Sequence, residues 1–193
     1  MDPSQLNILF GWAAILSAVA TLLTLITGIL FFSAGGLFGL INDAASVIQM
    51  LLMLPIAAAL YLLTRHDATA LALLAAAIGV AGMLIAAVLQ ALLVFRVVEY
   101  EQSAAATLFA GGAVGIWLVL ANLLALVAGA LPAGLILTGI VAGAGYVLLV
   151  IGFRRGGQGH PLFYASSGLA VIGYTVWGAW LGILFLSGGL AVA

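Results

Sequence analysis

The sequence lacks cysteine and lysine, and it carries few charged residues of any kind. Without cysteine the chain can form no disulfide, no thiolate metal site and no iron–sulfur cluster, and it has no cysteine nucleophile. Its four basic residues are all arginines, and its formal net charge is −1. A basic surface for nucleic acid is therefore excluded, and polybasic recognition of lipid headgroups is unsupported.

Charged residues make up 5% of the chain and hydrophobic residues 67%, whereas a soluble domain has about a quarter charged residues. A soluble core of 193 residues could not hide so much apolar surface, so lipid is the expected solvent. The N-terminal residues 1–5 are acidic and lack the basic region that precedes the apolar core of a cleavable signal peptide. We therefore expect the first apolar run to be a retained membrane span.

Long uncharged runs separated by short polar turns predict an all-α membrane protein, a compact bundle of six transmembrane helices in one domain, residues 1–193. The spans are expected at about residues 6–32, 44–63, 68–95, 104–127, 133–153 and 162–186. This topology places both termini on one side of the membrane. Arg96, Arg154 and Arg155 on the other side, against Arg65 alone, favour both termini outside.

The four basic and five acidic residues all fall in predicted loops or at helix ends. Because proton and ion pathways generally need ionisable groups inside the membrane, a pump or an ion-coupled transporter is disfavoured. Asp43 precedes a predicted span, where it is expected to cap the helix, with a buried functional acid as the alternative. His66 and His160 are predicted in loops on opposite faces of the membrane, so they cannot share a haem or a metal ion.

Uncharged polar residues occur inside the predicted spans. Thr21, Thr24 and Thr27 share one side of the first span. Their hydroxyls are expected to bond to carbonyls of the preceding turn, and a polar stripe for a ligand is the alternative. Gln49 and Gln90 are the strongly polar residues of the second and third predicted spans.

Aromatic residues lie near mid-depth in the last three predicted spans. The candidate centre consists of Trp117, Asn122, Tyr146, Tyr174 and Trp177, with Asn122 as a polar partner. Buried Tyr and Trp usually find such a partner, so the centre either locks these helices by packing or forms a pocket for an apolar ligand. Glycines four residues apart are predicted helix contacts, namely Gly111 and Gly115, Gly139 and Gly143, and Gly178 and Gly182.

No cluster of acids or nucleophiles indicates an intramembrane hydrolase or transferase, so we predict no catalytic residue, no metal site and no cofactor. The glycine pairs favour a non-enzymatic structural or accessory membrane subunit that packs against partner helices. Membrane lipid, protein partners or further copies of the chain are then its expected partners. The alternative is a binder or carrier of an apolar ligand, such as a lipid, quinone or pigment, in the bundle of the last three helices.

Two segments resemble a widespread bacterial family of six-span membrane proteins of unknown function. They are MLPIAAALYLL at residues 53–63 and IWLVLANLLALVAGALPAGLILTGIVAGAGY at residues 116–146. In that family a proline-bearing second helix ends in an alanine–leucine–tyrosine run, and a Leu-Pro turn leads into a glycine-rich fifth helix. The resemblance implies six spans and location in a bacterial cytoplasmic membrane, and it implies no activity and no catalytic residues.

Overall fold

The computed structural model describes residues 2–190 of the chain. These residues form the helices α1 (Pro3–Ala34), α2 (Leu37–Val94), α3 (Tyr100–Val127), α4 (Ala133–Gly156) and α5 (Pro161–Leu186), with the short 3-10 helix η1 (Gly157–Gly159) before α5. Within this described part no strand occurs, and five helices are long and apolar enough to cross a membrane. The chain is therefore an all-α protein compatible with a multi-pass membrane location.

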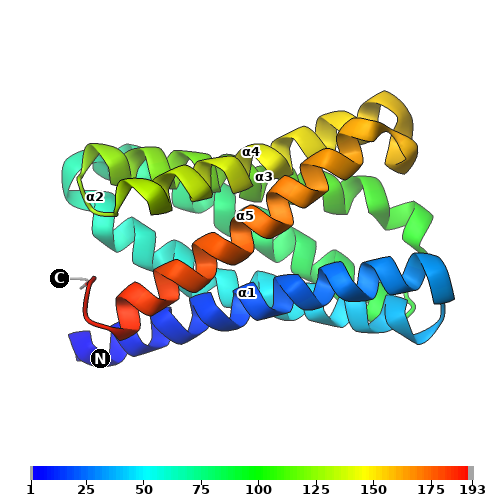
Figure 1. The fold of residues 1–193 in the computed structure, drawn as a ribbon, viewed down its shortest axis with the longest axis horizontal. Coiled ribbons are helices and arrows are strands. Elements are labelled where there is room, and N and C mark those ends of the chain that lie inside the picture. The colour runs from blue at the N-terminus through cyan, green and yellow to red at the C-terminus, as the bar shows by residue number, and fades with distance from the viewer. Residues whose placement is uncertain (1, 191–193) are drawn as a thin grey trace.

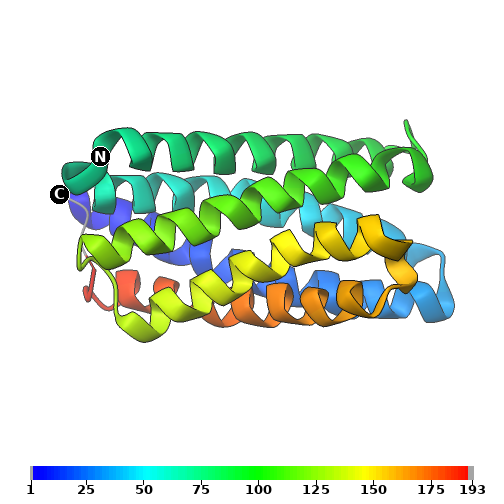
Figure 2. The same cartoon turned by 90° about the horizontal axis from the view of Figure 1, so that it is seen from above.

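The prediction of six separate helices is wrong for residues 44–95. α2 is 58 residues long and covers both spans expected there, because the polar segment 64–67 stays helical. Inside α2, which the structure describes throughout, Ala68 alone leaves the helical region, with φ −153° and ψ 59°. The helix folds back at this residue, and its two arms run side by side (Figure 1, Figure 2).

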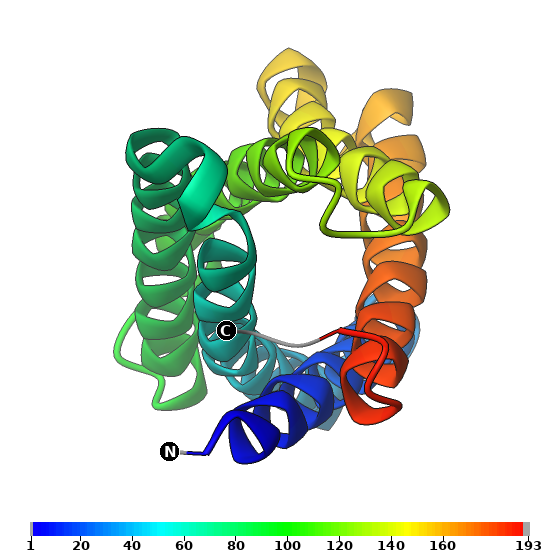
Figure 3. The same cartoon turned by 90° about the vertical axis from the view of Figure 1, so that its left-hand side faces the viewer.

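The helices form a closed ring. Each helix packs closely on the next one along the chain, and α5 packs on α1. Among residues 2–190 no other pair of these helices has Cα atoms within 8 Å, so other pairs meet only through side chains. The end-on view in Figure 3 shows this ring. α1 begins and α5 ends at one end of the bundle, so the α1–α2, α2–α3 and α4–α5 connections meet at the other end (Figure 1).

Glycines allow the close approach of neighbouring helices in this ring. A Cβ on Gly115 of α3 would lie 2.7 Å from the carbonyl oxygen of Gly143 of α4, and a Cβ on Gly143 would lie 2.7 Å from that of Gly115. A Cβ on Gly182 of α5 would lie 2.7 Å from the carbonyl oxygen of Gly11 of α1. These glycines therefore contact helices of the same chain.

Candidate functional site

Part of the predicted centre in the last three helices is a packed cluster. Trp177 Nε1 donates a hydrogen bond to Asn122 Oδ1 at 3.1 Å, and Asn122 Nδ2 donates to the carbonyl oxygen of Leu118 at 2.8 Å. The ring of Trp117 stands edge-on to that of Trp177, and the ring centroids of Tyr174 and Trp177 are 5.7 Å apart. All four of Trp117, Asn122, Tyr174 and Trp177 are at most 1% exposed. We call these four residues the aromatic centre.

Small residues close the space around the aromatic centre. A Cβ on Gly139 would lie 2.3 Å from Asn122 Nδ2, and a Cβ on Gly79 would lie 2.3 Å from Trp117 Cγ. Gly178 lies against α1, where an added Cβ would be 3.3 Å from the carbonyl oxygen of Ala14. The centre is therefore filled by its own side chains, which is the packing interpretation of the sequence pattern.

The two tyrosines of the predicted centre have different surroundings. The Tyr174 hydroxyl shares a hydrogen bond of 2.8 Å with Ser17 Oγ, which joins α5 to α1. The Tyr146 hydroxyl accepts a hydrogen bond of 3.3 Å from Gln49 Nε2 of α2. Tyr146 is absent from the ring contacts of the described residues and lines a cavity instead.

This interior cavity has a volume of about 190 Å³ and is walled by residues from all five helices. Its polar lining comes from Thr21, Thr24, Ser46, Gln49, Gln90, Thr107 and Tyr146. Apolar side chains such as Met50, Leu108 and Leu149 complete the wall, and no charged residue belongs to it. Gly111 also borders the cavity, and a Cβ added to it would meet only the Tyr146 ring, at 3.9 Å.

Two polar atoms in this wall have no hydrogen-bond partner. Gln90 Oε1 and Thr107 Oγ1 are both buried and unpaired. A buried polar group without a partner costs about 1–3 kcal/mol, and polar cavities in proteins are occupied by water or ligand. Among the described residues, one acceptor and one hydroxyl on residues that line the cavity are therefore left without a partner, which a guest could supply.

The threonines of α1 are satisfied by their own helix, as predicted. Thr21 Oγ1 donates to the Ser17 carbonyl at 2.8 Å, Thr24 Oγ1 to the Thr21 carbonyl at 2.7 Å, and Thr27 Oγ1 to the Leu23 carbonyl at 2.7 Å. The hydroxyl protons of these threonines are therefore already used in hydrogen bonds, unlike the side-chain oxygens of Gln90 and Thr107. The alternative of a polar stripe for a ligand on the threonines gains no support.

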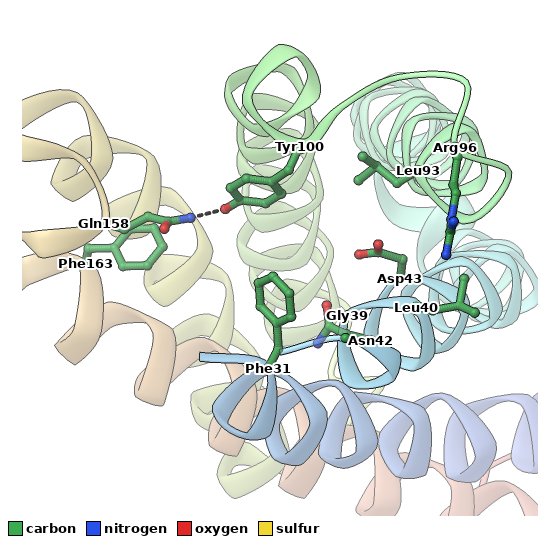
Figure 4. A pocket seen from close by; sticks show the side chains of 12 residues that line it. Phe31, Gly39, Leu40, Asn42, Asp43, Leu93, Arg96, Tyr100, Gln158 and Phe163 are labelled. Carbon is green, nitrogen blue, oxygen red and sulfur yellow. Dashed lines mark hydrogen bonds between the residues drawn. The ribbon is translucent and has the colours of Figure 1, made fainter. Parts of the chain in front are cut away.

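A second and larger cavity, which we call the outer cleft, opens where the α1–α2, α2–α3 and α4–α5 connections meet (Figure 4). Its volume is about 420 Å³, and its polar lining consists of Asn42, Asp43, Arg96, Tyr100 and Gln158. Gln158 Nε2 donates a hydrogen bond to the Tyr100 hydroxyl, which joins η1 to the start of α3 across the cleft. The cleft thus combines one acid, one base and neutral hydrogen-bonding groups.

The prediction that Asp43 caps a helix is wrong. α2 already begins at Leu37 with Gly36 as its N-cap, so Asp43 lies inside the helix. Only Gly35 and Gly36, both with positive φ, separate α1 from α2. The half-buried Asp43 side chain lines the outer cleft instead. The alternative, a buried functional acid, stays a prediction, since the structure shows only that the side chain is half-buried in the cleft.

Arg96 sits in the connection between α2 and α3. α2 ends at Val94, and Glu99 is the N-cap of α3. Arg96 has φ 56°, which among the described residues makes it the one non-glycine residue with positive φ. Such conformations cost about 1–3 kcal/mol and cluster at ligand-binding sites. The turn directs the arginine side chain into the outer cleft (Figure 4).

The outer cleft and the interior cavity adjoin each other. Asn42 lines the outer cleft, Thr24 lines the interior cavity, and Asn42 Nδ2 donates a hydrogen bond of 2.6 Å to the Thr24 carbonyl oxygen. This hydrogen bond ties the start of α2 to α1 at the boundary between the two spaces. A ligand that enters from the end of the bundle would reach Asn42 before it reaches the interior.

Neither histidine belongs to the lining of the interior cavity or of the outer cleft. His66 is an exposed residue inside α2, next to the bend, and not a loop residue as expected. His160 is the N-cap of α5, and its Nδ1 accepts a hydrogen bond of 3.1 Å from the Leu162 amide. In the part of the chain that the structure describes, no three His, Cys, Asp or Glu residues are grouped so that they could hold a metal ion.

Sequence reasoning found only part of these two spaces. Gln49 and Gln90 stand out as polar residues in apolar runs, but Thr107 of α3 passes unnoticed near the predicted start of its span. Tyr100 and Gln158 carry no sequence signal, since each meets its partner only in the folded bundle. A search for every uncharged polar side chain inside the apolar runs would have found Thr107.

In comparisons with protein-family models, with curated proteins and with solved structures, no match to this chain was found. The resemblance to a six-span bacterial family therefore stays a prediction. A functional assignment depends on the chemistry of the interior cavity and the outer cleft.

Proposed function

We propose that this chain is a non-enzymatic membrane protein that binds or carries a small amphiphilic ligand inside its helix ring. The observation that carries the proposal is the interior cavity, where Gln90 Oε1 and Thr107 Oγ1 are buried without partners. Ligand sites are mostly apolar concavities in which a few polar groups fix the orientation of the guest. The outer cleft, at about 420 Å³, falls within the roughly 300–1,000 Å³ that is usual for such sites.

The walls of the interior cavity define the chemistry of the part of the ligand that enters it. Because no charged side chain lines the cavity, a charged group there would lose its hydration without compensation. A neutral hydroxyl or amide could donate to Gln90 Oε1 and exchange a hydrogen bond with Thr107 Oγ1. The ligand therefore has a neutral hydrogen-bonding segment joined to apolar groups. This proposal moves the binding site from the aromatic centre, which is filled, to the adjoining cavity.

An accessory subunit is the second candidate function. The glycine pairs support this function less than the sequence indicates, because Gly115, Gly143 and Gly182 contact helices of the same chain. A different observation favours it: an apolar groove of about 450 Å³ between α2 and α3 is lined by small residues together with Ile78, Ile85 and Phe109. Small residues allow a partner helix to approach closely in lipid.

We further propose that the two arms of α2 cross the membrane separately, which gives six crossings in a bacterial cytoplasmic membrane with both termini outside. The bend at Ala68 and the polar segment 64–67 support two crossings, and the arginines at the opposite end support the orientation. Since the chain lacks cysteine, single cysteines can report the topology. His66→Cys and Gly159→Cys should react with an impermeant maleimide from opposite sides, and labelling from one side would contradict the proposal.

Binding is tested by purifying the protein with its native lipid and analysing the co-purified small molecules by mass spectrometry. We compare the wild type with Thr107→Val and with Gly111→Leu, which would fill the cavity. The matched controls are Thr138→Val, since Thr138 Oγ1 is satisfied by the Leu135 carbonyl at 2.8 Å, and Gly168→Leu, since an added Cβ at Gly168 meets nothing within 4 Å.

We expect one defined compound to accompany the wild type and both controls, and to fall about tenfold or more in both cavity variants. Circular dichroism and size-exclusion chromatography of each variant check that the fold is kept. Equal amounts of every compound in all five proteins, or bulk lipid alone, would contradict the binding function.

A further inference from the structure

The outer cleft places an acid and a base in one space. Asp43 lies near the start of α2 and Arg96 follows its end, and the bend at Ala68 brings these two ends of one helix together. Figure 4 shows the Asp43 carboxylate and the Arg96 side chain directed into the cleft from different sides. The interior cavity, with its uncharged wall, uses neither of them.

Neither charge is neutralised by the protein. Among the described residues no hydrogen bond or ion pair joins the Asp43 carboxylate or the Arg96 guanidinium to another group. Asp43 is half-buried, so its carboxylate has lost part of its hydration without gaining a partner. Arg96 is exposed but is held in a left-handed backbone conformation that aims it at the cleft. The pair is therefore arranged for a third group that carries both signs of charge.

The rest of the lining fits an amphiphile. Tyr100, Gln158 and Asn42 add neutral hydrogen-bonding groups, and the aromatic rings of Phe31 and Phe163 supply apolar wall. A guanidinium prefers the oxygens of a phosphate or carboxylate, which it can hold with two hydrogen bonds. A carboxylate accepts hydrogen bonds from an ammonium group.

We propose that the outer cleft binds a zwitterionic ligand, with its ammonium group on Asp43 and its phosphate or carboxylate on Arg96. Two sources supply this chemistry: the headgroup of a phosphoethanolamine lipid and a free zwitterion of similar structure. This inference rests on the proposed binding function, and it assigns the charged part of the ligand to the cleft and the neutral segment to the adjoining cavity.

The test measures binding of three short-chain probes to the purified full chain in detergent: dihexanoyl phosphatidylethanolamine, dihexanoyl phosphatidylglycerol and glycerophosphoethanolamine, which has the headgroup alone. The variants are Asp43→Asn, which keeps the side-chain shape, and Arg96→Asn, because asparagine tolerates the positive φ at this position. The controls are Asp67→Asn and Arg155→Gln, which remove charges at exposed positions outside the cleft.

We expect the wild type and both controls to bind phosphatidylethanolamine about tenfold more tightly than phosphatidylglycerol, which has no ammonium group. Asp43→Asn should lose this preference, while Arg96→Asn should weaken both lipids about tenfold. Competition by glycerophosphoethanolamine at equal concentration would identify a free zwitterion as the ligand, and competition only by the lipid would identify the lipid headgroup.

Phosphatidylethanolamine binding that is unchanged in both cleft variants, or a wild type without preference between the two lipids, would overturn this inference. Thr107→Val, measured with the same probes, separates it from the binding function. If Thr107→Val removes the native guest while the cleft variants change nothing, the zwitterion site fails and the binding function stands. If none of these variants changes any binding, both fail.

Discussion

In the aromatic centre Asn122, Tyr174 and Trp177 each have a hydrogen-bond partner, whereas two polar atoms of residues that line the interior cavity have none. Asn122 bonds both to Trp177 and to its own helix, and Tyr174 bonds to Ser17. Gln90 and Thr107 line the cavity, and Gln90 Oε1 and Thr107 Oγ1 are buried without partners. Both regions belong to the same helix ring.

The difference separates residues that hold the bundle together from residues that are open to a ligand. Polar side chains that are hydrogen-bonded and closely packed fix how neighbouring helices pack against each other. Such a cluster leaves neither space nor free hydrogen-bonding groups for a ligand. Buried polar atoms without partners in the cavity wall lower the stability of the ligand-free protein. A ligand that supplies the missing hydrogen bonds would remove this cost. Substitutions in the two regions should therefore have opposite consequences for stability, and four predictions test this contrast.

The largest loss is expected for Trp177→Ala in the aromatic centre. Removing this fully buried ring should lower the free energy of unfolding by about 3–5 kcal/mol, because it leaves a cavity and removes the hydrogen-bond donor of Asn122 Oδ1. Reversible unfolding in mixed micelles measures the change. The control is Trp180→Ala on the same helix, where the side chain is 37% exposed. A loss no larger than that of the control would show that the centre does not hold the bundle.

Two glycines of α3 should respond in opposite directions to alanine. Gly115→Ala places a methyl 2.7 Å from the Gly143 carbonyl oxygen, and such overpacking should cost about 1–3 kcal/mol. Gly111→Ala meets only the Tyr146 ring at 3.9 Å and should gain roughly 0.5–1 kcal/mol from the better helix propensity. The same unfolding experiment compares them. Equal effects would mean that the cavity wall is packed as tightly as the α3–α4 contact.

A smaller loss is expected for Asn122→Leu. The substitution keeps most of the volume but leaves the buried Trp177 Nε1 without its acceptor, at a cost of about 1 kcal/mol. Tryptophan fluorescence and the unfolding midpoint report the change together. The double variant Asn122→Leu with Trp177→Phe should recover part of the loss, since no unpaired donor remains. Failure of this recovery would contradict the role of the hydrogen bond.

The smallest effect, with the opposite sign, is expected for Thr107→Val in the interior cavity. The Thr107 hydroxyl has no partner, so its removal should leave stability unchanged or raise it by up to about 1 kcal/mol. Thr138→Val, which removes a hydroxyl already bonded to backbone, is the reference. A clear destabilisation by Thr107→Val alone would show that the hydroxyl has a structural partner, which would remove the contrast between the two regions.

The helical fold, the apolar helices long enough to cross a membrane and most helix ends could be predicted from the sequence because their causes are local. An uncharged run of about 20 residues is enough to indicate a span, and Pro132 and Pro161 precede or begin helices as expected. The helix pattern failed at Asp43 and at segment 64–67, where polar residues typical of turns remain helical. At Asp43 the half-buried side chain lines the outer cleft, which the local pattern does not show, and at segment 64–67 the chain bends only at the following residue, Ala68.

The sequence by itself determined that this chain is an all-α protein suited to lipid, with few charges, no cysteine chemistry and polar residues spaced along apolar helices. Only the tertiary structure decided which of those residues meet. Ser17 and Tyr174 are 157 positions apart, Gln49 and Tyr146 are 97 apart, and ring closure brings each pair together. The physical reason is that lipid is as apolar as the helix surfaces. Hydrophobic pattern therefore does not mark which face turns inward, and packing of small residues and hydrogen bonds decides it.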